Sequence, residues 1–402
     1  MTSNEKKIIT ITSFGHFMSH FNMLFFPALV IPMASYHDTN VADIVSRSFW
    51  MYCLFGITAL PWGFLADRLG ARLLMIIFHI GAGFCCLGAG LWINHPDTMA
   101  IYLAGLGVFS GIYHPTGLGW ISHSVSRISI GMAINGMCGN LGMAVAPILA
   151  GFINWMYGLK AVFLFVSGIN CLGILLLLCL SVQSHINETE PSKYSRNKLL
   201  KTFIILLVTM MFGGMAYRGS TVILPAYFEL KNQGVFQFFS LFFHDLSPNV
   251  VAAVSVSLVF LAGMAGQYAG GRFAEHFDLR YCYIAFHLVC IPMAILMAYI
   301  VNFPLIVITM VYFFFLLGMQ PIENTLVAKL SPSQFMHSAY GAKFVVTFGI
   351  AALSVKMVAG IEKHMGMSPV FLVLSGVSIL IILCIVALIM NTDPIRMNES
   401  RL

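Results

Sequence analysis

Twelve long apolar runs, separated by short polar segments, take up most of this chain. Each run holds the roughly 20 apolar residues that an α-helix needs to cross the hydrocarbon core of a bilayer. The predicted membrane spans are Ile8–Tyr36, Ile44–Ala66, Leu73–Asn94, Thr98–Ser122, Ile130–Met156, Leu159–Val182, Leu200–Phe228, Val250–Glu275, Tyr281–Val301, Pro304–Leu330, Phe335–Ile361 and Pro369–Met390.

The pattern also divides the chain into two similar parts. A polar linker at residues 184–199 separates six predicted spans in residues 1–183 from six in residues 200–402. One loop sequence occurs in both parts: residues 63–72 read Gly-Phe-Leu-Ala-Asp-Arg-Leu-Gly-Ala-Arg, and residues 271–280 read Gly-Arg-Phe-Ala-Glu-His-Phe-Asp-Leu-Arg. The repeat predicts a duplicated fold, which is typical of transporters that rock one half against the other.

Composition excludes a water-soluble globule. The chain is 59% hydrophobic and only 9% charged, whereas a soluble domain has about 25% charged residues. The net charge of +6 does not indicate nucleic acid, because no basic cluster is denser than Lys193–Lys201. The nine cysteines fall in apolar runs without zinc-ligand spacing, so we expect neither disulfides nor a metal site or cofactor. The first apolar run is too long for a cleavable signal, and we expect it to be retained.

The distribution of Lys and Arg predicts the orientation in the membrane. One side of the predicted bundle carries fourteen basic residues, namely Lys6, Lys7, Arg68, Arg72, Arg127, Lys193, Arg196, Lys198, Lys201, Arg272, Arg280, Lys329, Arg396 and Arg401. The opposite side carries Arg47, Lys160, Lys231 and Lys363. Because basic loops stay on the cytoplasmic side, we expect both termini and the linker to be cytoplasmic, in a bacterial inner membrane.

Three charged residues, Arg218, Glu323 and Lys343, lie well inside predicted spans. Each costs about 2.5 to 3.5 kcal/mol at the bilayer centre, or roughly 9 kcal/mol together, so they must face protein or water. One interpretation is a structural ion pair of Glu323 with Arg218 or with Lys343. The other is a polar pathway for a solute.

Polar neighbours favour the pathway. Gln320, Glu323 and Asn324 form one stripe at helical spacing, and Lys343 forms another with Tyr340 and Thr347. A lone buried salt bridge would not need such stripes.

Intramembrane histidines add a second group of candidates. His16 and His20 are four residues apart and share a helix face, and His20 occupies the repeat position of Arg218. A basic pair across the duplication suits an anion. The alternative for a single membrane histidine is a hydrogen bond to a neighbouring helix, and for His20 and His114 both interpretations stay open.

Residues 63–72 resemble the loop signature between the second and third helices of the major facilitator superfamily, Gly-x-x-x-Asp-Arg-x-Gly-x-Arg. The resemblance implies an all-α membrane protein with twelve transmembrane helices in two pseudo-symmetric six-helix halves around a central cavity. It implies that the first, fourth, seventh and tenth helices line that cavity. It also implies a cytoplasmic gating latch made of Gly63, Asp67, Arg68, Arg72, Glu275 and Arg280.

Further motifs are similar to the fosmidomycin-resistance-like branch of that superfamily. They are Gly-Ile-Tyr-His-Pro-Thr-Gly at residues 111–117 and Gly-His-Phe at residues 15–17, with Pro27 and Pro32 downstream. The resemblance implies proton-driven transport, and fosmidomycin is a small phosphonate anion. Residues 142–151 resemble the antiporter signature, with Ala at two positions where Gly is usual, which favours export. The plain interpretation is that these small residues let helices pack closely.

We therefore expect a proton-coupled transporter of a small organic anion, not an enzyme, working as a monomer in the bilayer. The sequence lacks a nucleotide-binding loop, so an ion gradient is the expected energy source. Glu323 is the predicted proton carrier. The predicted substrate contacts are His16, His20, His114, Arg218, Gln320, Asn324 and Lys343.

Other functions stay open. Several cations around one cavity also suit an importer of a polycarboxylate, such as a carboxylate-type siderophore or its iron complex. Outside the transporter class, the chain could be a membrane enzyme, a haem protein that uses intramembrane histidines, or a receptor that does not transport. His79 and His287 are 208 residues apart, so duplication alone explains that pair.

The outer segment Glu229–Asn249 is unusual because it carries Phe236, Phe238, Phe239, Phe242 and Phe243. It is too short to span the membrane but apolar enough to lie in the interface or to cap the bundle. A passive cap is the favoured interpretation over a moving lid.

Overall fold

The structure is a computed structural model, which describes residues 1–126, 128–182, 196–243, 245–330 and 341–392. These residues form helices and no strand. Among them, eleven helical segments are long and apolar enough to cross a membrane. The fourth predicted span is the exception, because a turn at residues 111–112 leaves helices of 15 and 12 residues, each too short to cross a bilayer alone.

The N-terminal half contains α1 (Ser3–Leu24), η1 (Phe26–Leu29), α2 (Val30–Tyr36), α3 (Val41–Arg47), α4 (Phe49–Ile57), α5 (Ala59–Leu69), α6 (Ala71–Leu91), α7 (Pro96–Ser110), α8 (Tyr113–Ser124), α9 (Ile128–Tyr157) and α10 (Leu159–Cys179). The C-terminal half contains α11 (Arg196–Lys231), α12 (Gln233–Ser240), α13 (Pro248–His276), α14 (Leu279–Tyr299), α15 (Asn302–Leu330), the π-helical turn η3 (Val345–Gly349), η4 (Ile350–Ala352), α17 (Leu353–Met365) and α18 (Ser368–Asn391).

The break between α7 and α8 has a local cause. Pro115 lacks a backbone N–H, so the helix cannot form the bond from residue 115 to the carbonyl of Gly111. Gly111 also packs against the Phe55 carbonyl, which leaves no room for a side chain. Together α7 and α8 cover the fourth predicted span, and the break at residues 111–112 lies two residues before His114.

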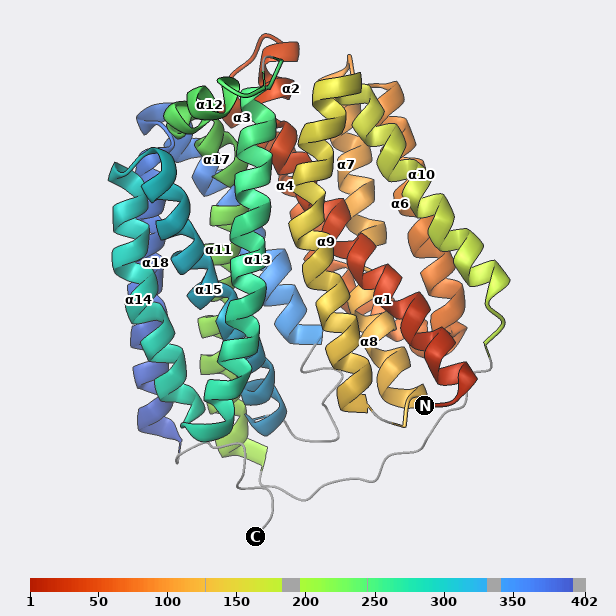
Figure 1. The fold of residues 1–402 in the computed structure, drawn as a ribbon. Helices are drawn as coiled ribbons and strands as arrows, with labels where there is room; N and C mark the ends of the chain where they lie inside the picture. The colour runs from red at the N-terminus through yellow and green to blue at the C-terminus, as the bar shows by residue number, and fades with distance from the viewer. Residues whose placement is uncertain (127, 183–195, 244, 331–340, 393–402) are drawn as a thin grey trace.

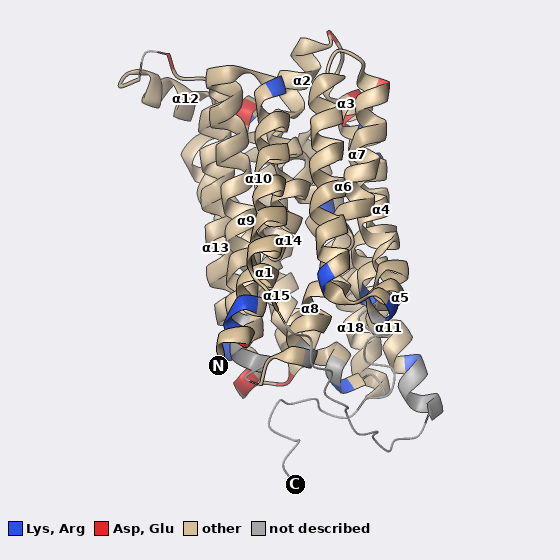
Figure 2. Ribbon diagram, turned by 90° about the vertical axis from the view of Figure 1, so that its right-hand side faces the viewer, with Lys and Arg blue, Asp and Glu red and all other residues tan. Residues whose placement is uncertain are grey.

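The two halves lie side by side, with α9 and α13 packed against each other between them (Figure 1). Contacts between the halves also gather at the end of the bundle opposite the N-terminus, where α3 meets α17. There Asn249 at the start of α13 donates to the Ala28 carbonyl (2.7 Å), and Lys356 on α17 donates to Ser46 Oγ (2.5 Å). Lys and Arg gather toward the other end, where the N-terminus lies (Figure 2).

The duplication extends to the turns that start equivalent helices. Gly158 before α10 and Gly366 before α18 are 208 residues apart, and both adopt positive φ, at 78° and 79°. A residue with a side chain would be strained at either position. The two turns support the predicted duplication with evidence independent of the loop motif.

The small residues of segment 142–151 do pack helices closely. A side chain at Gly142 would strike the Phe17 carbonyl of α1, and one at Gly151 would strike Ala253 of α13. This segment of α9 therefore touches both halves, as the plain interpretation of the motif requires.

Helix α12, in the segment predicted to be outer, lies at the edge of the bundle rather than over it (Figure 2). Gly234 donates to Asn302 Oδ1 (2.8 Å), and the Phe238 ring lies 5.8 Å from that of Phe303 at the start of α15. Phe242 and Phe243 stay exposed. Of the two predicted positions, this placement favours the membrane interface over a cap.

Candidate functional site

Three histidines of the N-terminal half lie close together, an arrangement that the sequence alone does not determine. His16 and His20 project from α1, and His114 projects from the start of α8. Their ring centroids lie 4.9 Å apart for His16 and His20, and 5.4 Å apart for each pair with His114. The two α1 histidines also bring their Nε2 atoms to 3.1 Å.

Asn135 on α9 fixes the orientation of His16. The Nδ1 atom of His16 lies 2.9 Å from the Asn135 carbonyl and 2.8 Å from its Oδ1. Because both oxygens are acceptors, Nδ1 carries the proton and Nε2 presents a lone pair to His20. Tyr113 holds Asn135 through hydrogen bonds in both directions and stacks on the His16 ring at 4.9 Å.

Lys343 and Glu323 form a buried ion pair in the C-terminal half. Lys343 Nζ lies 3.5 Å from Glu323 Oε2, and the Tyr283 hydroxyl donates to Glu323 Oε1 (2.7 Å). Lys343 also donates to Asn324 Oδ1 (2.6 Å). Asn324 is exposed, so this cluster reaches the accessible surface of the protein. Of the two ion pairs predicted from sequence, the structure forms the one with Lys343.

Arg218 lies apart from that pair. Its side chain is buried, with 3% exposure, and its guanidinium carbon lies 3.8 Å from the ring centroid of Tyr52 on α4. Neither Nε nor Nη1 has a hydrogen-bond partner. In the described parts of the chain no carboxylate lies within salt-bridge distance of Arg218. A buried cation with unpaired donors costs free energy unless an anion joins it.

The cationic groups of one half face the histidines of the other. Arg218 interacts electrostatically with His20, and Lys343 interacts with His114. The His114 ring stacks on Phe344 at 4.9 Å and on Phe348 at 5.6 Å. His20, His114, Arg218 and Lys343 therefore lie near one another across the interface between the halves.

Gln320 bonds to an amide side chain of a neighbouring helix. Gln267 on α13 donates to Gln320 Oε1 (2.6 Å) and accepts a hydrogen bond from Asn140 on α9. This chain of amides joins the two halves. Thr347 donates to the Lys343 carbonyl (2.8 Å), so its hydroxyl bonds to the backbone one turn earlier. Tyr340 lies outside the described residues.

The predicted gating arginines join helices within each half. Arg72 at the start of α6 donates to the Leu177 carbonyl near the end of α10 (2.7 Å). Arg280 at the start of α14 donates to the Thr392 carbonyl after α18 (2.8 Å) and pairs with Asp278 (2.7 Å). The two arginines are 208 residues apart and hold equivalent helix pairs. Cations suit these helix ends because carbonyl groups there lack helical partners.

The other members of the predicted latch are less engaged. Gly63 lies close to Pro115, Arg68 is exposed, and Glu275 forms a solvent-accessible pair with Arg272 at 3.3 Å. The side chain of Asp67 lies outside the described residues. A gating role for these residues stays a prediction.

Replacing Arg280 with Ala should lower the melting temperature of the purified protein by several degrees. The substitution removes the cation that faces the buried Asp278 carboxylate, and breaking a buried pair in this way costs about 3 to 5 kcal/mol. The matched control is Arg68→Ala, whose exposed side chain contributes about 0.5 kcal/mol or less. Equal melting temperatures for the two variants in detergent would contradict this role of Arg280.

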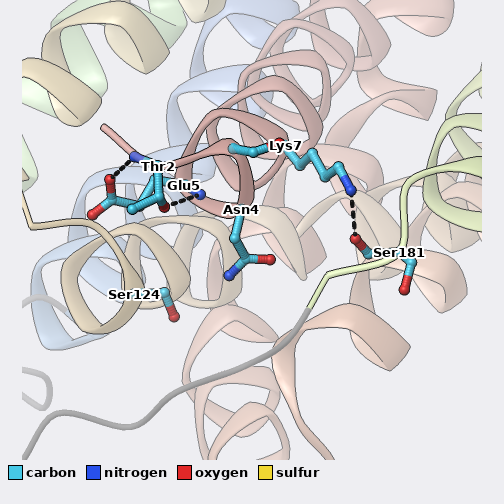
Figure 3. Close-up of a pocket in the computed structure, with 7 residues that line it drawn as sticks. Thr2, Asn4, Glu5, Lys7, Ser124 and Ser181 are labelled. Carbon is cyan, nitrogen blue, oxygen red and sulfur yellow. Dashed lines mark hydrogen bonds between the residues drawn. The ribbon is translucent and has the colours of Figure 1, made fainter.

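A pocket at the N-terminal end of the bundle contains none of the predicted site residues (Figure 3). Its lining includes Thr2, Glu5 and Lys7 of α1, and Lys7 donates to the Ser181 carbonyl after α10 (3.3 Å). Glu5 caps the helix start by accepting from the backbone of Thr2 (2.6 Å) and of Ser126 (2.7 Å). These contacts anchor the start of α1.

Several residues around the site were missed from sequence. Tyr52, Asn135, Gln267 and Tyr283 each contact a predicted residue across helices. Asn135 and Gln267 did carry a signal, because amide side chains inside apolar runs usually bond to a neighbouring helix. The tyrosines did not, since tyrosine is common in membrane helices.

A two-part helical bundle with polar groups buried between its parts is the architecture of many membrane transporters. The family model of the Major Facilitator Superfamily matches residues 10–355, so the chain belongs to that superfamily. The recognition from the loop motif is confirmed at this level, and so is the predicted all-helical fold. The resemblance to the fosmidomycin-resistance-like branch stays a prediction.

Two curated relatives are exporters or resistance proteins by name. The chain is 28% identical over 173 residues to the enterobactin exporter EntS of Shigella flexneri, which covers 40% of each chain. It is 24% identical over 288 residues to the multidrug resistance protein MdtG of Enterobacter lignolyticus, which covers 66% of this chain and 62% of the relative. The matched regions thus span less than two thirds of these relatives.

Solved structures agree with the fold. A POT family transporter in complex with 5-aminolevulinic acid matches with a TM-score of 0.75 and 15% identity over 96% of each chain. The nucleoside transporter NupG matches with a TM-score of 0.73 and 16% identity, over 96% of this chain and all of NupG. A D-xylose–proton symporter gives a TM-score of 0.71 at 11% identity, over 98% of this chain and 99% of the symporter.

Proposed function

We propose that this protein is a proton-coupled secondary transporter that moves a small organic anion across the bacterial inner membrane by alternating access. The observation that carries the proposal is Arg218, a buried cation at the interface of the halves whose Nε and Nη1 are unpaired. An anionic group placed there would accept these hydrogen bonds and offset the cost of burying the charge.

The other residues take roles around that anion. Lys343 provides a second cation, Glu323 carries the proton, and His20 and His114 face the substrate from the opposite half. His16, Gln320 and Asn324 complete the set of proposed contacts. The halves are residues 1–183 and 200–402, joined by the linker at 184–199, and both termini are cytoplasmic.

Export is the favoured direction. The names of the relatives support it, since they describe an enterobactin exporter and a multidrug resistance protein. In an exporter driven by the proton gradient, proton and substrate occupy the site in turn.

The ion pair of Lys343 with Glu323 favours import as a second candidate. A substrate anion must compete with the Glu323 carboxylate for the Lys343 ammonium, 3.5 Å away. Protonation of Glu323 would release Lys343 and strengthen anion binding, so proton and anion would bind together. Such coupling suits uptake of a polycarboxylate, alone or as a metal complex.

Fosmidomycin, citrate and ferric citrate are suitable probes of the anion class. We expect at least one of them to raise the melting temperature of the purified full-length protein, because a ligand at 100 times its Kd stabilises the folded state by about 2.7 kcal/mol. Ethidium, a cationic drug, is the control and should give no shift. Stabilisation by ethidium with none by the three anions would overturn the proposed substrate class.

A further inference from the structure

The cluster of His16, His20 and His114 has the composition of a transition-metal site, with its ring nitrogens close to one another. One nitrogen of each ring lies within 4.8 Å of the others. Around a tetrahedral zinc ion, with Zn–N bonds of about 2.0 to 2.1 Å, ligand nitrogens are separated by roughly 3.3 Å. The Nε2 atoms of His16 and His20 lie 3.1 Å apart, within hydrogen-bond distance of each other and close to that separation.

The hydrogen bonds around the cluster leave ligand atoms available. Asn135 accepts from Nδ1 of His16, which directs the Nε2 lone pair into the cluster. Metal-binding histidines commonly have this arrangement, in which the distal ring nitrogen donates to a carbonyl. Nε2 of His114 is buried without any hydrogen-bond partner. That orphan atom is a second observation that points to a ligand.

We propose that His16, His20 and His114 together bind one divalent transition-metal ion. Imidazole nitrogens suit zinc, cobalt, nickel and copper, whereas magnesium and calcium prefer oxygen ligands. Three neutral imidazoles leave the fourth position of a tetrahedral ion open.

The surroundings hold the cluster in place from both halves. Tyr113 stacks on His16 in the N-terminal half, and Phe344 and Phe348 of the C-terminal half stack on His114. Movement of one half against the other would thus shift His114 relative to the aromatic rings that cover it. The metal site is predicted from geometry alone and does not depend on the proposed anion transport.

The test uses the full-length protein purified through a tag without histidine and stripped with EDTA. After incubation with Zn2+ and desalting, we expect about one zinc per chain by elemental analysis, and none after incubation with Mg2+. Titration with Co2+ should give the visible absorption of a tetrahedral ion. A stripped wild-type protein that retains no zinc and gives no Co2+ absorption would overturn the site.

Single variants locate the ion. Losing a residue that only hydrogen-bonds to a metal ligand weakens metal binding by about 10- to 100-fold. Each of His16→Gln, His20→Gln and His114→Gln removes a ligand itself and should weaken Zn2+ binding by at least that factor. His79→Gln is the matched control, because His79 is buried on α6, bonded to Asn170 (3.3 Å) and not one of the clustered histidines. Zinc retained by all three variants, or lost equally in the control, would place the metal elsewhere. Failure of the three anion probes would leave this result unaffected.

Discussion

Replacing Arg218 with Gln is expected to weaken binding of the substrate anion by about 10- to 150-fold. Hydrogen bonds to a charged group contribute about 1.5 to 3 kcal/mol, and every 1.4 kcal/mol is a tenfold change in affinity. Gln keeps a polar side chain over Tyr52 but removes the charge that the anion neutralises. The measurement is the concentration dependence of the thermal shift, with whichever of the three probe anions stabilises the wild type.

The Arg218→Gln substitution should not lower the stability of the folded protein. Its wild-type side chain is a buried cation with unpaired donors, so removing the charge relieves a cost of burial. A melting temperature without ligand at or above that of the wild type is therefore expected. Arg272→Gln is the control, because the Arg272 side chain is 62% exposed and its loss should leave affinity unchanged. Unchanged affinity in Arg218→Gln would remove this residue from the site.

Glu323→Gln is expected to abolish accumulation of the anion against its gradient while exchange of labelled for unlabelled anion continues. Gln cannot release a proton, yet its oxygen still accepts the hydrogen bond from Tyr283. The measurement is transport into proteoliposomes with an imposed pH gradient, compared with exchange at equal pH. Accumulation equal to that of the wild type would show that another group carries the proton.

The same variant separates the two directions of transport. Gln resembles protonated Glu, so it frees Lys343 from its pair. If proton and anion bind together, as in the importer, Glu323→Gln should bind the anion more tightly. If they alternate, as in the exporter, it should bind more weakly. Glu362→Gln makes the same change near the C-terminal end of α17 and should alter neither accumulation nor affinity.

The gross architecture follows from sequence because bilayers impose a simple rule on it. Backbone polar groups in hydrocarbon must bond within their own segment, so each long apolar run becomes a helix. The repeated loop, with Arg72 and Arg280 at equivalent positions, then identified the duplication. The same logic marked Arg218, Glu323 and Lys343, since a charge inside an apolar run is costly wherever it lies.

Helical periodicity says which residues share a face of one helix but nothing about the helix opposite. Sequence thus left open whether Glu323 pairs with Arg218 or with Lys343. The tertiary structure placed Lys343 beside Glu323 and turned Arg218 toward Tyr52. It also placed Gln320 in an amide chain with Gln267.

The histidine cluster shows the same division most clearly. Sequence spacing placed His16 and His20 on one helix face, but His114 is almost a hundred residues further along the chain. The absence of zinc-type cysteine spacing therefore predicted no metal site. Helix packing and the break between α7 and α8 brought the third ring to the other two. The sequence by itself determined which polar residues enter the membrane, because each residue carries its own free-energy cost of insertion. Their partners were decided by the tertiary structure, because they depend on contacts between helices distant in the chain.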